Sequence, residues 1–153
     1  MWKFIPTMAI FNKKIEIESR KQFELIDITD HVNEAISQSK IANGMVLVYN
    51  PHTTASVRLN HKEPLLEQDI MKMLYRLVPL EENYSHDLFE MRDQVDSNER
   101  SNGHAHVAAF LLGSSEIVPI ENSQLMKGEK QSLFFVECDG PRPRDFFITI
   151  YGE

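Results

Sequence analysis

The stretch that decides the fold is GMVLVYNPHTTASVRLN, residues 44–60. Residues 45–49 form an uninterrupted apolar run that follows Gly44, as is typical of a buried strand. Residues 55–59 alternate apolar side chains with Ser and Arg, the period-two pattern of a strand with one polar face, on which Arg58 lies. Pro51 and His52 interrupt the two runs. The stretch therefore predicts two strands joined by a short polar loop.

Further strands are predicted on both sides of this stretch. Apolar residues in short runs or at every second position favour strands at 14–18, 23–27, 116–120, 132–137 and 146–151. The residues Cys138-Asp139-Gly140-Pro141 separate the last two, so these strands are a hairpin candidate.

Three helices are predicted between the strands. The first begins at Thr29 or Asp30 as N-cap, the second runs from Pro64 to the stop at Pro79, and the third runs from an Asn102 cap to Leu112. Strands and helices in no alternating order indicate an α+β fold. We expect a largely antiparallel β-sandwich core with two to three helices, as a single domain over residues 1–153. The polar stretch 80–103 has no sustained periodicity, and a connection of that length is functional or disordered.

Composition excludes several classes of protein. The chain has 153 residues, 42% hydrophobic and 25% charged, as expected of a folded globular protein. A net charge of −7 argues against a nucleic-acid partner. Cys138 is the lone cysteine, so no internal disulfide forms. Residues 1–11 lack the apolar core of a signal peptide, and no stretch is long enough to span a membrane. We expect a cytoplasmic protein.

Histidines supply the first candidates for chemistry. His52-Thr53-Thr54 places an imidazole and two hydroxyls at a strand break, where they can face a cleft. A turn held by local hydrogen bonds is the plainer interpretation. His104 and His106 share a face in an extended chain and suit a divalent metal, but they lie about 200° apart on a helix. A surface or core histidine pair is the alternative.

Two further motifs carry charge. Tyr84-Ser85-His86-Asp87 lies in the polar stretch and places a histidine beside a carboxylate. The carboxylate can orient the histidine as a metal ligand. The alternative is a solvated loop. Prolines hold residues 139–144 extended, so Arg142 and Arg144 project in a defined way. They are either a clamp for phosphate or carboxylate, or members of surface ion pairs. Surface or structural roles are expected for His31 and His61, and Cys138 is expected to be buried and inert.

The order of these motifs resembles the YjbQ-like family, described as secondary thiamine-phosphate synthases, over nearly the whole chain. The resemblance is carried by His52-Thr53-Thr54-Ala55-Ser56-Val57, Asn60, Tyr84-x-His86-Asp87, Asn102-x-His104, Gly113-Ser114-Ser115, Pro119, Gln131, Asp139-Gly140-Pro141-Arg142-x-Arg144 and Gly152.

The resemblance implies an α+β fold around a β-sandwich, a homotrimer, and a histidine-lined pocket that holds a divalent metal, zinc or magnesium. It also implies a weak transferase activity in which thiazole phosphate displaces pyrophosphate from hydroxymethylpyrimidine diphosphate. The chain departs from the family pattern at residues 60–64, which are shorter and lack the Glu that the family has after Asn60, at residues 123–131, which lack a Trp, and in the long loop between His86 and His104.

The site expected from these motifs combines three groups of residues. The catalytic residues are His52, His86 and His104, and the metal ligands are these three with His106. The residues that bind the phosphorylated small-molecule substrate are Thr53, Thr54, Asn60, Asp69, Arg142 and Arg144. Two alternatives stay open at this point, namely a metal-dependent hydrolase and a non-catalytic trimeric protein that binds a ligand or metal.

Overall fold

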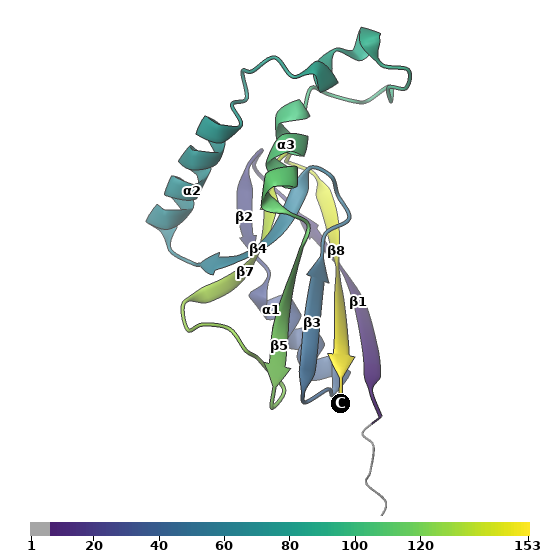
Figure 1. Ribbon diagram of the computed structural model, residues 1–153, viewed down its shortest axis with the longest axis vertical. Helices are drawn as coiled ribbons and strands as arrows, with labels where there is room; N and C mark the ends of the chain where they lie inside the picture. Colours follow the sequence, from purple (N-terminus) through teal and green to yellow (C-terminus); the bar gives the residue numbers. More distant parts are fainter. Residues whose placement is uncertain (1–6) are drawn as a thin grey trace, which may run out of the picture.

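In the part of the chain that the structure describes, eight strands form two facing sheets (Figure 1). A computed structural model describes residues 7–153. The larger sheet has the order β1-β8-β3-β5-β6 and the smaller sheet the order β2-β7-β4, and the pairs in both are antiparallel. The strands are β1 (Ala9–Glu18), β2 (Glu24–Asp27), β3 (Gly44–Tyr49), β4 (Ala55–His61), β5 (Ser115–Glu121), β6 (Gln124–Leu125), β7 (Gln131–Glu137) and β8 (Pro143–Gly152). The predicted α+β fold with an antiparallel core is confirmed.

The predicted helices are α1 (Thr29–Ser39), α2 (Pro64–Leu77) and α3 (Gly103–Leu112). Val32, Ala35 and Ile36 of α1 are fully or almost fully buried in the main core, with the inward side chains of both sheets. A second core forms around Phe134 and Val136 of β7, which face Ala105 and Ala108 of α3 and other apolar residues. Helices therefore cover the outer face of the smaller sheet.

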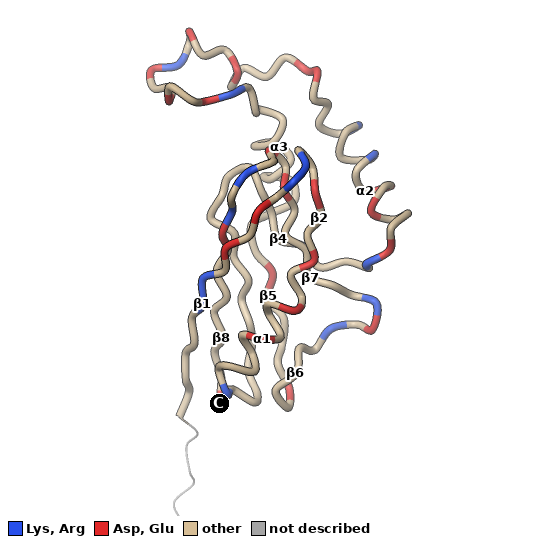
Figure 2. Tube along the Cα trace, turned by 180° about the vertical axis from the view of Figure 1, so that it is seen from behind, with Lys and Arg blue, Asp and Glu red and all other residues tan. Residues whose placement is uncertain are grey.

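The outer face of the larger sheet is open instead. Strand alternation sends Val46 and Val48 of β3 into the core and leaves its neighbouring residues outward. The same alternation exposes apolar side chains on four adjacent strands: Ile10, Met45, Tyr49, Ile117, Phe147 and Tyr151. Figure 2 shows that the lower part of this sheet carries few charged residues. We call these six residues the open sheet face.

Two predictions of local structure are wrong. The strands β7 and β8 do not form a hairpin, because β7 pairs with β2 and β4 whereas β8 pairs with β1 and β3. The turn between them carries the chain from one sheet to the other, and Gly140 packs so closely against the backbone of Lys21 that a side chain would collide with it. The side chain of Thr29 does not cap α1, since its hydroxyl accepts from the N–H of Leu133.

The polar stretch after α2 is ordered by short turns. It contains two 3₁₀ turns, η1 (Ser85–Asp87) and η2 (Phe89–Met91), and leads into α3 (Figure 1). We call residues 80–102 the strap. Within residues 7–153, no helix has the length and apolar character needed to cross a bilayer. The predicted absence of a leader concerns residues 1–11, of which 1–6 lie outside the described part of the chain.

Candidate functional site

The loop between β3 and β4 is fastened by Asn50. Its amide nitrogen donates to the carbonyls of His52 (2.9 Å) and Ala55 (2.6 Å), and its amide oxygen accepts from the N–H of His52 (3.0 Å). Asn50 is buried, so these bonds are shielded from water and satisfy the backbone of the loop. The turn with local hydrogen bonds predicted for this motif is therefore present, and it fixes the backbone that carries His52.

Arg144 supports the same loop from inside the sandwich. Its guanidinium donates to Glu137 through Nε (2.7 Å) and Nη2 (2.5 Å), and Nη2 also donates to Thr54 Oγ1 (2.8 Å). Glu137 also accepts from the Ser19 hydroxyl and the N–H of Asp139, both at 2.8 Å. Burial by itself raises the pKa of Glu137, but the bonds from Arg144 and Asp139 outweigh it and hold that pKa below its usual range.

This network corrects the predicted phosphate clamp. The side chain of Arg144 is 4% exposed and that of Glu137 is fully buried. The guanidinium therefore forms an internal ion pair and does not face solvent as a phosphate clamp would. Arg142 lies nearer the surface, and its Nη2 is 2.9 Å from Asp139 Oδ2. Arg144 is therefore a buried structural residue of the site, whereas the side chain of Arg142 is partly exposed to solvent.

His52 contacts the residue that follows Arg144. The Nε2 atom of His52 accepts from the main-chain N–H of Asp145 (3.0 Å) and lies 3.0 Å from Asp145 Oδ1. Lys14 Nζ is 2.6 Å from the other carboxylate oxygen. The hydrogen bond and charge of Lys14 hold the pKa of Asp145 below its usual range, so the carboxylate is ionised at neutral pH. Because β8 alternates, Arg144 and Asp145 support the same loop from opposite faces of one strand.

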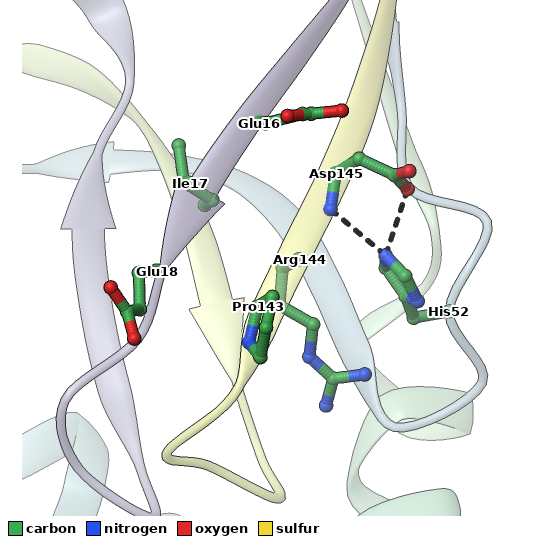
Figure 3. Close-up of a pocket in the computed structure, with 7 residues that line it drawn as sticks. All are labelled: Glu16, Ile17, Glu18, His52, Pro143, Arg144 and Asp145. Atoms are coloured by element: carbon green, nitrogen blue, oxygen red, sulfur yellow. Dashed lines mark hydrogen bonds and ion pairs between the residues drawn. The ribbon is translucent and has the colours of Figure 1, made fainter.

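His52 lines two cavities. The first has a volume of about 570 Å³ and is lined by β1, the start of β8 and His52 (Figure 3). The second, of about 440 Å³, lies between the loop and α3 and is lined by His52, Thr53 and His106, among others. Both volumes are within the range of sites for small molecules. Three carboxylates face the first cavity, from Glu16, Glu18 and Asp145, whereas the lining of the second includes Tyr49 and Phe110.

His86 of the strap lies against His106 of α3. Their ring centroids are 4.6 Å apart, and His86 Nε2 is 3.5 Å from Glu99 Oε1. Arg92 Nη1 lies 2.5 Å from the same carboxylate oxygen, and the hydrogen bond from Arg92, helped by its charge, holds the pKa of Glu99 below its usual range. Burial lowers the pKa of His106, and the neighbouring His86 lowers it further. Among the described residues, His86 Nε2 is a buried atom without a hydrogen-bond partner.

His104 faces away from this pair. It is buried between Phe23 and Tyr84, with Nε2 3.3 Å from the Gln22 amide nitrogen. Burial is the main cause that lowers the pKa of His104, so the neutral ring is favoured. The two histidines of the His-x-His motif thus occupy different surroundings, as expected for residues about 200° apart on a helix.

The start of α3 is capped from the strap. Asp87 Oδ1 accepts from the N–H groups of Asn102 (3.0 Å) and Gly103 (2.9 Å). Asp87 therefore caps the helix, whereas the side chain of Asn102, the predicted cap, does not. The Asn102 amide instead donates to Asp139 Oδ2 (3.0 Å), and Arg100 donates to Asp139 Oδ1 (3.1 Å). The buried carboxylate of Asp139 thereby ties the strap to the turn before β8.

Two predicted substrate-binding residues lie elsewhere. Asn60 lines a separate cavity of about 180 Å³ between α2 and the smaller sheet. The side chain of Asp69 is 71% exposed on α2 and forms an ion pair with Lys72. Thr53 does line the second cavity, and the hydroxyl of Thr54 is buried against Arg144. The structure therefore gathers His52, Thr53 and His106 around one cavity and leaves Asn60 and Asp69 out.

The predicted metal ligands do not form one set within a chain. In the part of the chain that the structure describes, no three His, Cys, Asp or Glu side chains are grouped so that they could hold a metal ion. His52 faces Asp145, His104 faces Gln22, and His86 pairs with His106. A pair of histidines with one carboxylate already bound to Arg92 falls short of the three or four ligands that zinc takes from proteins.

Several residues of this site were missed in the sequence. Asp145 was missed because the predicted last strand begins at 146, whereas the alternation that places residues 144 and 145 on opposite faces starts earlier. Glu137 ends the predicted strand 132–137, and nothing in its local sequence marks it as the partner of an arginine. Asp139 was noted only as part of a turn, although a carboxylate beside two arginines signals an ion pair. Glu99 carries no local signal, because its partners lie in another part of the strap and on η1.

Comparison with known proteins places the chain in a family. Residues 13–153 match the model of the UPF0047 protein YjbQ-like family. A UPF0047 protein of Archaeoglobus fulgidus is 38% identical over 88% of this chain and 97% of its own length. One of Methanocaldococcus jannaschii is 35% identical over 92% of this chain and 94% of its own length.

Solved structures agree with this placement. A YbjQ-like protein of unknown function from Sulfolobus solfataricus matches with a TM-score of 0.87 and 32% identity, over 96% of this chain and 100% of that one. A hypothetical protein from Aeropyrum pernix matches with a TM-score of 0.83 and 31% identity, over 94% and 99%. The chain belongs to the UPF0047 family of YjbQ-like proteins.

Proposed function

We propose that the protein is a cytoplasmic transferase of the secondary thiamine-phosphate synthase type. It would condense hydroxymethylpyrimidine diphosphate with thiazole phosphate beside His52, which lines both cavities. The observation that carries this proposal is that His52 forms part of the wall of both cavities. A condensation requires two ligands to be held close together in a fixed orientation, and two cavities that have His52 in common suit that requirement.

The proposed reaction is one substitution at carbon. The bond between the pyrimidine methylene carbon and the diphosphate oxygen breaks, and its electron pair leaves with pyrophosphate. The lone pair of the thiazole ring nitrogen forms the new carbon–nitrogen bond, which gives the thiazolium ring of thiamine phosphate. No oxidant or reductant is required. The first cavity supports this assignment, because its carboxylates favour a ring that gains positive charge.

The phosphate groups need positive charge that one chain supplies only in part. Arg144 is bound to Glu137, and Lys14 is bound to Asp145. Of the two arginines of the predicted clamp, Arg142 is the one that reaches solvent and could bind a phosphate group. The predicted ligands do not gather within the described part of one chain, so a resident zinc or magnesium ion would need further ligands from another copy or from the substrate.

We propose that the protein assembles as a homotrimer through the open sheet face. Ile10 and Ile117 are 66% and 63% exposed there, on strands whose lower parts carry few charged residues (Figure 2). An extended apolar face of this kind is typical of an interface between copies of a chain. Ile117→Lys should then lower the mass measured by light scattering to that of one chain, whereas Lys72→Ala on α2 should leave it unchanged. A monomeric wild type would refute the trimer.

A direct assay tests the proposed reaction. The wild-type protein is incubated with both substrates, and thiamine phosphate is followed by mass spectrometry alongside released pyrophosphate. We expect His52→Ala to lower product formation at least about tenfold, as for loss of a positioned catalytic group. Asp27→Asn, a change at a surface pair with Lys62, should leave it unchanged. Absence of product above background with wild-type protein would refute the proposal.

One observation favours a second function. Within residues 7–153, the cationic side chain that lines either cavity is Arg144, which is already paired. That arrangement suits a protein that binds a ligand without transforming it. Calorimetry with each substrate separates the two functions, because binding without product would favour a non-catalytic ligand-binding protein.

A further inference from the structure

His52 is held at one ring nitrogen and open at the other. Its Nε2 atom faces two groups of Asp145, the main-chain N–H and carboxylate oxygen Oδ1, each at 3.0 Å (Figure 3). Among the hydrogen bonds of residues 7–153, none involves Nδ1, which lies on the side of the ring away from Asp145. Nδ1 is therefore the nitrogen that remains for a ligand.

The main-chain N–H determines which nitrogen carries the proton. This N–H belongs to a paired strand, where Asp145 is opposite Glu16, and it donates to Nε2. When the neutral ring accepts this hydrogen bond, its lone pair is on Nε2 and its proton is on Nδ1. A protonated ring carries N–H groups at both nitrogens, and Oδ1 accepts from Nε2. In either form, Nδ1 presents an N–H group.

The surroundings keep this arrangement in place. Lys14 Nζ, 2.6 Å from Asp145 Oδ2, fixes the carboxylate, and Glu16 is the other acidic group beside Lys14, at 3.7 Å. On the opposite side, the buried Asn50 side chain holds both the N–H and the carbonyl of His52. The ring and the backbone of His52 are thus fixed by different elements, β8 and the end of β3.

We infer that Asp145 is a positioning residue that holds His52 with its Nδ1–H directed to the ligand, as a hydrogen-bond donor to a phosphoryl oxygen. The choice of a phosphoryl oxygen rests on the proposed function. A donor at this place supports departure of pyrophosphate, because it stabilises the negative charge that develops on the leaving oxygen. The arrangement also removes His52 from the predicted metal ligands, since neither nitrogen of the neutral ring has a free lone pair facing outward.

Nuclear magnetic resonance of the imidazole nitrogens tests the positioning. In ¹⁵N-labelled protein at alkaline pH, where histidine rings are neutral, we expect protonated Nδ1 and unprotonated Nε2 in His52, with His52→Asn used to assign the signals. Addition of Zn²⁺ should leave them unchanged. Protonated Nε2 with unprotonated Nδ1, or loss of the Nδ1 proton on addition of Zn²⁺, would overturn the inference.

Binding of inorganic pyrophosphate tests the donor. In His52→Asn the side-chain amide nitrogen takes the position of Nδ1, whereas in His52→Gln it takes the position of Nε2. Because the inferred donor is at Nδ1, His52→Asn should bind pyrophosphate more tightly than His52→Gln. Asp145→Ala should weaken binding about fivefold, as for one hydrogen bond. Asp27→Asn is the matched control, because its lysine pair has similar length and exposure: 2.8 Å with Asp27 23% exposed, against 2.6 Å with Asp145 25% exposed.

Failure of the inference is distinguishable from failure of the proposed function. Equal binding by His52→Asn and His52→Gln, or no binding by the wild-type protein, would overturn the donor role even if thiamine phosphate is formed. If Nδ1 of His52 carries the proton and His52→Asn binds pyrophosphate more tightly than His52→Gln, but no thiamine phosphate is formed, the inference is upheld and the synthase proposal is refuted.

Discussion

The His52 loop and the strap are two sides of the same candidate site, and they are built differently. Around the loop, the buried polar groups of Asn50, Glu137 and Arg144 are bonded to one another or to the backbone. In the strap, two buried atoms of the described chain, His86 Nε2 and Asn102 Oδ1, have no partner. A satisfied buried network is rigid, whereas an unsatisfied buried atom costs free energy until it is paired.

This difference separates two roles. The loop presents His52 in one orientation before any ligand arrives, which is what a positioned donor requires. The strap holds His86 against His106, which lines the second cavity, and His86 Nε2 has capacity for a further hydrogen bond. We therefore expect ligand binding to change the strap and to leave the loop as it is.

The largest expected effect comes from breaking the network of the loop. Arg144→Met leaves the carboxylate of Glu137 buried without a cation, and removal of one partner of a buried pair costs about 3–5 kcal/mol. Unfolding in urea measures the free energy of unfolding of the variant and of the wild type. The double variant Arg144→Met with Glu137→Gln should recover part of the loss, and a single variant as stable as the wild type would contradict the role assigned to this pair.

A smaller effect is expected where the strap caps α3. Asp87→Ala removes the acceptor of two N–H groups at the helix start, which should lower the free energy of unfolding by about 1–2 kcal/mol. Asp69→Ala on α2 is the control, because that side chain is exposed, and the change should stay within about 0.5 kcal/mol. Equal effects of the two substitutions would mean that Asp87 does not cap the helix.

The smallest expected effect is the pH dependence caused by His104. Burial lowers its pKa in the folded state, so the unfolded chain takes up a proton more readily. The stability is complete above the ordinary histidine pKa of about 6.5 and falls as the pH drops below that value. His104→Gln should flatten this part of the curve of thermal midpoint against pH. An unchanged slope in the variant would assign the dependence to other groups.

Local patterns predicted most of the fold. Strict alternation in residues 55–59 and the spacing of apolar residues after Pro64 gave β4 and α2, because one buried face leaves a clear period. The crossing from β7 to β8 could not be predicted, since the pairing of a strand depends on distant partners. His52 was found because it interrupts two strands, but its partner Asp145 is 93 residues away. Arg144 was misassigned because nothing in the local sequence marks Glu137 as its buried partner.

Amide hydrogen exchange, with and without hydroxymethylpyrimidine diphosphate, tests the contrast between the two sides of the site most directly. We predict that amides of residues 50–54 and 143–147 exchange slowly in the free protein and change little when the substrate is added. We predict that amides of residues 85–102 exchange faster and become protected. Protection that appears in residues 50–54 while the strap stays unchanged would contradict a pre-organised loop and an adjustable strap.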